Sequence, residues 1–177
     1  MFSAVVYIGL YLQSGFWGNY FIFGIFSACL IIAGIVDLRI HLLPNIINAA
    51  GIAAAFMISV IRGIAASHAT PVWNFIAGAA ACGVPLFLIT LVSKRGMGMG
   101  DVKFAALIGA FLGVYGGLCA LWLSVVLGGV FSAALIVSGK ASRKTPIPFG
   151  PFMALAALAM VFFGDSIKGF ISAAYHV

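Results

Sequence analysis

Charge is scarce in this sequence of 177 residues: only 7% of the residues are charged, and Asp37, Asp101 and Asp165 are the only acids. A soluble globular domain normally carries about 25% charged residues, so this composition excludes that class. Hydrophobic residues make up 64% of the chain. The sequence therefore predicts a protein embedded in a membrane.

Long stretches without Lys, Arg, Asp or Glu support this prediction. A helix of about 20 apolar residues crosses the hydrocarbon core, and each of these stretches has at least 20 residues. Helices are expected because every backbone amide in lipid must be satisfied within its own segment, whereas barrel strands would alternate apolar and polar residues. The stretches are 1–36, 42–61, 63–93, 104–139 and 145–164.

We predict an all-α fold, a polytopic transmembrane bundle of about six helices with short loops, in which residues 1–177 form a single membrane-embedded domain. The stretch 104–139 has to contain two crossings, and we place their turn near residues 115–117. Residues 1–12 are either a short additional crossing or an interfacial segment. The predicted helices cover 19–36, 46–65, 72–93, 102–115, 118–138 and 149–164.

Basic residues give the chain a formal net charge of +6. Most of them lie in three short connections between predicted helices, and the number of crossings places all three connections on one side. Because basic residues near helix ends favour the cytoplasm, we expect this side to face it. The charges are explained by topology and lipid contact, so no nucleic-acid partner is expected. The residues in the three connections are Arg39, Lys94, Arg95, Lys103, Lys140, Arg143 and Lys144.

Cysteine offers no metal site. Cys29, Cys82 and Cys119 all lie inside apolar stretches, and none belongs to a CxxC pair, so a zinc knuckle is not indicated. No His, Cys, Asp or Glu cluster has the spacing of metal ligands. We therefore expect neither a metal nor a cofactor.

Two of the acids, Asp37 and Asp101, are predicted at the same end of the bundle, one closing a helix and the other opening one. An ionisable group near hydrocarbon is costly and suggests a functional site. Two carboxyl groups together suggest an aspartyl dyad, in which one ionised Asp takes a proton from water and a protonated Asp hydrogen-bonds a substrate carbonyl. The alternatives are helix-end charges in a structural protein, or a proton relay in a small transporter or channel.

Glycines precede the second acid in the string Gly98-Met99-Gly100-Asp101. Glycine allows another backbone to approach closely, as an extended peptide substrate would require, and it also permits positive φ. Such a run is weak evidence by itself, because it also occurs in simple turns. A phosphate loop is not indicated, since no Gly-Lys-Ser/Thr follows.

The string 98–101, followed by Val102-Lys103-Phe104, resembles the GxGD signature of membrane-embedded aspartic peptidases. The wider segment 96–113 is similar to the prepilin peptidases, as is Asp37 followed by Leu43-Pro44-Asn45. A third similar string occupies the last basic connection. That string contains Pro146, Ile147, Pro148, Phe149, Gly150 and Pro151.

This resemblance implies an enzyme of the bacterial inner membrane, without metal, that cleaves the basic leader of type IV prepilins or pseudopilins at the cytoplasmic face. Such cleavage serves pilus assembly and protein secretion. By position, Asp37 and Asp101 are the catalytic pair. A membrane peptidase that cuts inside the bilayer, similar to presenilin, is the alternative within this class. The residues implied to shape the site are Pro44, Asn45, Gly98, Gly100, Lys103, Pro148, Phe149, Gly150 and Pro151.

Two departures from the family's pattern narrow the expectation. Long members carry an N-terminal domain with paired CxxC motifs and a methyltransferase activity, and this sequence shows neither motif, so methylation is not expected. Many long members also have Asp at the position of Asn45. Asn is common among short members that resemble the peptidases of tight-adherence (Flp) pilus systems, and this favours a substrate of that kind.

Overall fold

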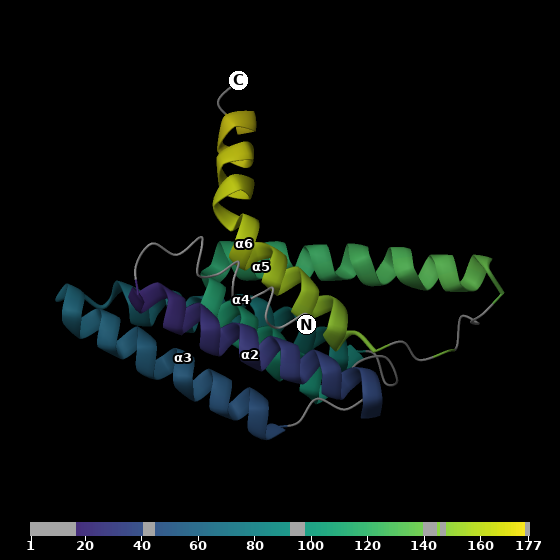
Figure 1. The fold of residues 1–177 in the computed structure, drawn as a ribbon, viewed down its shortest axis with the longest axis horizontal. Helices are drawn as coiled ribbons and strands as arrows, with labels where there is room; N and C mark the ends of the chain where they lie inside the picture. Colours follow the sequence, from purple (N-terminus) through teal and green to yellow (C-terminus); the bar gives the residue numbers. More distant parts are fainter. Residues whose placement is uncertain (1–16, 41–44, 93–97, 140–144, 146–147, 176–177) are drawn as a thin grey trace.

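The computed structural model describes residues 17–40, 45–92, 98–139, 145 and 148–175, and these residues form helices without strands. The all-α prediction is therefore confirmed for the described part of the chain. Four helices are long and apolar enough to cross a membrane, and α6 adds a shorter apolar stretch over 150–164. The helices are α2 (Trp17–Ile40), α3 (Asn45–Ala66), α4 (Thr70–Val92), α5 (Met99–Val137) and α6 (Gly150–Tyr175) (Figure 1).

Some of the predicted features lie outside the described residues. These are the segment 1–12, the site-shaping residue Pro44, and most of the basic residues assigned to the three connections. Arg39 and Lys103 are described and exposed.

The predicted turn at residues 115–117 is wrong in position, because the chain reverses at Gly113. This residue has φ 71° and ψ −175°, a conformation that is essentially restricted to glycine. A Cβ on Gly117 would lie 2.9 Å from the Cα of Gly109, although residues this far apart in a straight helix are separated by about 12 Å. Residues 99–112 and 114–137 are therefore two segments of α5 that fold back on each other.

Glycines bring α4 and both segments of α5 into close contact. A Cβ added to Gly109 would overlap the carbonyl of Gly78 on α4, and it would lie 2.8 Å from the Sγ of Cys82. Small residues at helix interfaces allow backbones to approach closely in a membrane, where the hydrophobic effect between helices is absent. The contact holds the reversal at Gly113 against α4.

The first segment of α5 lies at the centre of the bundle. Its residues Phe104, Leu107 and Ile108 are fully buried, together with Phe26 of α2 and Met153 of α6. Phe26 also stacks on Phe111, with ring centroids 4.5 Å apart. The N-terminal end of this central segment bears Asp101, so packing of the core fixes the position of that acid.

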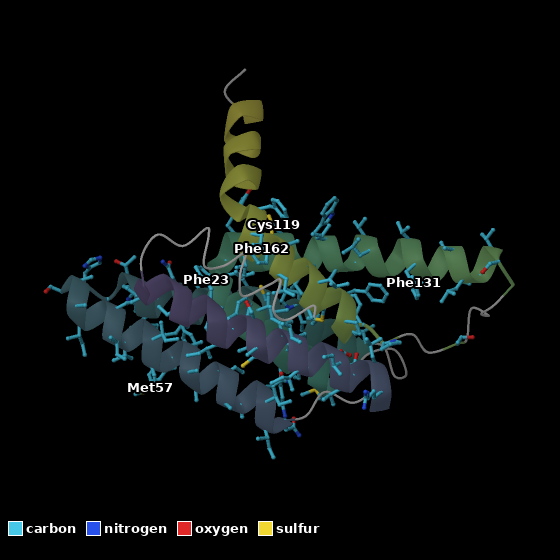
Figure 2. The ribbon with its side chains drawn as sticks, in the orientation of Figure 1. Phe23, Met57, Cys119, Phe131 and Phe162 are labelled. Atoms are coloured by element: carbon cyan, nitrogen blue, oxygen red, sulfur yellow. The ribbon has the colours of Figure 1, made fainter. Side chains whose placement is uncertain are left out.

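Apolar side chains also cover the outside of the bundle, as expected for a surface that faces lipid. Met57 points away from the other helices in Figure 2 and is 60% exposed. Trp73 on α4 and Trp122 on the second segment of α5 are also exposed. Figure 1 shows this second segment, in green, extending beyond the other helices.

Several predicted helix ends differ from those observed. Helix α2 continues to Ile40, so Asp37 lies within its last turn and does not end it. Helix α5 begins at Met99, which places Asp101 in its first turn. Helix α6 continues to Tyr175, although Asp165 and Lys168 suggested an end near residue 164. An apolar run marks only the part of a helix that lies in lipid, so it sets a minimum length.

Gly113 and Gly129 form a matched pair for testing the reversal, because an added Cβ would meet nothing within 4 Å at either position. Of these two glycines, only Gly113 has a positive φ. We expect Gly113→Ala to destabilise the protein by roughly 1–3 kcal/mol through backbone strain. Gly129→Ala should be neutral or stabilising by up to about 1 kcal/mol. Thermal unfolding of both variants in detergent measures the difference, and equal melting temperatures would contradict the assigned reversal.

Candidate active site

Asp37 is buried between α2 and the start of α6, where its side chain is only 5% exposed. Its Oδ2 accepts a hydrogen bond of 3.0 Å from the backbone N–H of Gly150. Gly150 is the first residue of α6, and the N–H groups of the first helical turn have no partner within their own helix. The carboxylate thus satisfies one of these groups, and the helix dipole favours negative charge there.

The close approach of α2 and α6 depends on two glycines. A Cβ on Gly150 would lie 2.6 Å from Oδ2 of Asp37 and 3.0 Å from its Cγ. One turn earlier in α2, a Cβ on Gly34 would lie 3.3 Å from the Cβ of Ala154. Because an aspartate side chain is short, it reaches the N–H of α6 only when the two backbones lie this close.

Asp101 lies at the start of α5 in a related arrangement. Its Oδ2 accepts a 3.1 Å hydrogen bond from the N–H of Gly98, and its own N–H donates to the carbonyl of Gly98 at 3.1 Å. Gly98 has an extended backbone, with φ −82° and ψ 152°. Gly98 therefore does not use the positive φ that glycine permits.

The two acids, 64 positions apart in the sequence, lie at the same end of the bundle, where α2 ends and α5 and α6 begin. Each of them lies beside the N-terminus of a helix, Asp37 beside α6 and Asp101 within the first turn of α5. Among the described residues, no group of three His, Cys, Asp or Glu side chains is arranged to hold a metal ion.

Helix α3 supplies polar contacts to the first turn of α5. Lys103 Nζ donates a 2.8 Å hydrogen bond to Oδ1 of Asn45. One turn along α3, Nδ2 of Asn48 donates to the carbonyl of Gly100 at 3.4 Å. The sequence predicted Asn45, Gly100 and Lys103 as site residues but missed Asn48. The pattern that could have indicated Asn48 is a polar residue three positions after Asn45, on the same face of an otherwise apolar helix.

Three further described residues of the third string lie around the start of α6. Pro151 is buried, and Pro148 and Phe149 are partly buried. Pro148 and Phe149 border a cavity of about 230 Å³ between the start of α6 and the second segment of α5. The residues lining the cavity are Val125, Gly128, Gly129, Ser132, Pro148, Phe149 and Phe152.

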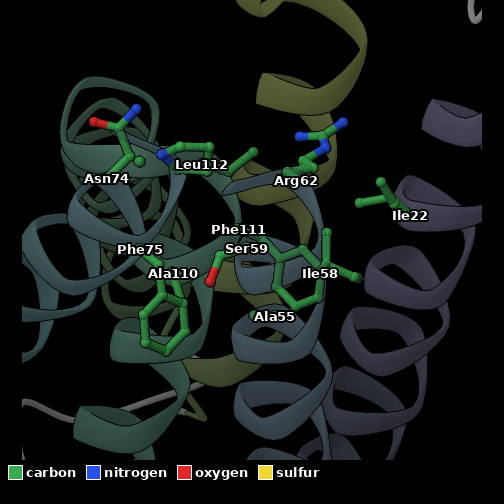
Figure 3. Close-up of a pocket in the computed structure, with 12 residues that line it drawn as sticks. Ile22, Ala55, Ile58, Ser59, Arg62, Asn74, Phe75, Ala110, Phe111 and Leu112 are labelled. Carbon is green, nitrogen blue, oxygen red and sulfur yellow. The ribbon is translucent and has the colours of Figure 1, made fainter. Parts of the chain in front are cut away.

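A second cavity, of about 280 Å³, lies at the opposite end of the bundle (Figure 3). Arg62 of α3, Asn74 of α4 and Ser59 contribute its polar lining, and Gly113 borders it. Neither catalytic candidate lines this cavity. The only arginine of α3 is thus separated from Asp37 and Asp101, which lie at the end of the bundle where α3 and α5 begin.

Comparison with known proteins gives a family assignment. A family model described as the type IV leader peptidase family matches residues 24–133. The chain belongs to the type IV leader peptidase family. The match includes both Asp37 and Asp101, and the family predicted from the three strings is confirmed. No solved structure matches the chain significantly.

Curated relatives of this family member are named prepilin leader peptidase/N-methyltransferase. The relative from Bacillus subtilis (strain 168) is 33% identical over 149 residues, which is 82% of this chain and 57% of the relative. That from Stutzerimonas stutzeri is 37% identical over 59% of this chain and 37% of the relative. That from Pseudomonas putida is 32% identical over 78% of this chain and 48% of the relative. The chain thus spans less than two thirds of the length of each.

Gly150 and Gly164 lie on the same helix and allow a controlled test of the α2–α6 contact. Gly150→Ala should destabilise the protein by roughly 1–3 kcal/mol, because the new methyl group must displace the buried carboxyl group of Asp37. A Cβ on Gly164 would meet only the Cε of Met160 at 3.7 Å, so Gly164→Ala should not destabilise it. Unfolding in detergent measures both variants. If Gly150→Ala were as stable as the control, the contact would be misassigned.

Proposed function

We propose that this protein is a membrane aspartic endopeptidase that removes the basic leader peptide of type IV prepilins or pseudopilins. Asp37 and Asp101 act as the catalytic pair, with water as the nucleophile. The observation that supports the proposal is the placement of both carboxyl groups at one end of the bundle, each bonded to a backbone N–H group at the start of a helix. Family membership and the relatives' names supply the substrate class.

The reaction requires the two carboxyl groups to share one proton. The ionised carboxylate removes a proton from water as the oxygen attacks the scissile carbonyl, while the protonated carboxyl group hydrogen-bonds the carbonyl oxygen. A proton then passes to the leaving amine, and both cleavage products depart. Because the two groups titrate as a pair, neither role belongs to one aspartate alone.

The proposed setting is the cytoplasmic face of the bacterial inner membrane. Arg39 and Lys103 lie at the helix ends next to the two aspartates and are exposed, which agrees with the preference of basic residues for the cytoplasm. Prepilin leaders are themselves basic, so these side chains are not the binding site for the leader. Lys103 instead donates to Asn45. We expect the substrate helix to dock laterally from the bilayer and its unwound leader to cross the two carboxyl groups.

Replacement of either aspartate by asparagine tests the catalytic pair. Asp37→Asn and Asp101→Asn should each reduce cleavage of a co-expressed candidate prepilin by about 10²–10⁴-fold, since each removes an acid–base group. The measurement is the shortening of the prepilin on a gel. The matched control is Asp165→Asn, because residue 165 lies along α6 roughly 22 Å from its start at Gly150.

Cleavage that survives either substitution at full rate would reject the pair. If the wild-type protein shortened no candidate prepilin but conducted protons in vesicles, the relay alternative would replace the peptidase. Cleavage within the hydrophobic helix of the substrate would indicate the presenilin-like alternative. The position of the cut, determined by N-terminal sequencing of the product, separates these outcomes.

A shared proton also predicts how activity depends on pH. Cleavage should fall at low pH, where both carboxyl groups are protonated and no base remains. It should fall again at high pH, where both are ionised and no acid remains. A bell-shaped profile of kcat/KM for the purified enzyme is the expected result. A profile that rises to a plateau would contradict a mechanism in which both groups act.

A further inference from the structure

Asn48 is a fully buried polar residue in an apolar helix, with only 1% of its surface exposed. It lies on the face of α3 that packs against α5. A Cβ on the next residue of this face, Gly51, would lie 2.8 Å from Leu107 of α5. The approach of the two helices therefore presses Asn48 against the first turn of α5.

The amide group of Asn48 contacts the backbone directly next to Asp101. Its Nδ2 donates to the carbonyl oxygen of Gly100 at 3.4 Å. This carbonyl and the amide nitrogen of Asp101 belong to one peptide group, which is planar and rigid. A contact that fixes the carbonyl therefore also fixes the plane from which the Cα of Asp101 extends.

The other atom of the amide group, Oδ1, is buried and has no hydrogen-bond partner among the described protein groups. The carbonyl oxygen of Gly100 can only accept a hydrogen bond, and Nδ2 is the only donor on the side chain of Asn48. The contact with Gly100 therefore sets which way the amide group is turned. A buried acceptor without a partner costs about 1–3 kcal/mol. A leucine of similar size would fill this space without that cost, so packing alone does not explain an asparagine here.

We propose that Asn48 is a positioning residue for Asp101, acting through the carbonyl of Gly100. The inference rests on the proposed peptidase function, because it assigns a role in aligning one of the two catalytic carboxyl groups. Two contacts hold the first turn of α5, since Asn45 binds Lys103 at the exposed side and Asn48 binds Gly100 at the buried side. The backbone from which the side chain of Asp101 extends is thereby held in place.

The charged groups around this contact determine what a substitution does. On α5 they are Asp101 and Lys103, and on α2 they are Asp37 and Arg39. The described part of α4 contains no Lys, Arg, Asp, Glu or His. An additional carboxylate at position 48 would face the carbonyl oxygen of Gly100, in the residue before Asp101, whereas a protonated carboxyl group could donate to that oxygen as the amide does.

Two substitutions test the proposal on the purified full chain with a prepilin that the wild type cleaves. Asn48→Leu keeps the volume but removes the donor, and we expect kcat to fall about 10–100-fold, as a small misplacement of a catalytic group does. The KM should change far less, because Asn48 is not placed in contact with substrate. Ser59→Ala is the matched control, since Ser59 is also buried on this face of α3 but bonds only to Phe56 of its own helix.

Asn48→Asp gives a readout that a purely structural residue would not change. When the introduced carboxyl group is protonated it restores the donor to Gly100, so kcat relative to wild type should rise as the pH falls. The measurement is made at saturating substrate and well below the melting temperature of the variant at every pH. This keeps loss of folded protein out of the ratio.

The outcomes separate the two proposals. A kcat of Asn48→Leu equal to that of the Ser59→Ala control would reject the positioning role. So would a ratio for Asn48→Asp that stays constant with pH, or a loss that appears in KM alone. In each of these cases the peptidase function stands, because wild-type cleavage is measured in the same experiment. If the wild type cleaves no prepilin, the proposed function itself fails and this inference fails with it.

Discussion

The hydrogen bond between the buried carboxylate of Asp37 and the N–H of Gly150 is the constraint on which the candidate site depends. It joins the last turn of α2 to the first residue of α6, two elements far apart in the sequence. The bond exists only because Gly150 has no Cβ, which would lie 2.6 Å from Oδ2 of Asp37. Any larger residue there would move the acid, and with it the geometry relative to Asp101.

The protein uses the same physical solution for both acids. A buried carboxylate in a low-dielectric setting is costly unless it is hydrogen-bonded. Helix N-termini supply backbone donors and a favourable dipole without adding charge. Asp37 takes a donor from α6, and Asp101 takes one from the residue that precedes α5. Each carboxyl group thus accepts a hydrogen bond from a backbone N–H group at the start of a helix.

The helical class, the membrane setting and the family were predictable from the sequence, because long apolar runs and three short strings indicate them directly. The reversal of α5 was predicted near residues 115–117 and occurs at Gly113. Gly113, Gly116 and Gly117 are equally compatible with a turn when only their identity is known. Packing against Gly78 and Cys82 of α4 selects among them, and such a contact between distant segments leaves no trace in a local pattern.

The sequence alone determined which residue types are present for chemistry: three acids, two of them at predicted helix ends on one side of a membrane. Tertiary structure decided that Asp37 and Asp101 lie at one end of the bundle, that Gly150 donates to Asp37, and that Asn48 donates to the carbonyl of Gly100 beside Asp101. The reason is that hydrophobic runs specify where helices lie along the chain, whereas the depth and rotation of each helix arise from side-chain contacts between helices. The depth and rotation of the helices determine which atoms come within hydrogen-bonding distance.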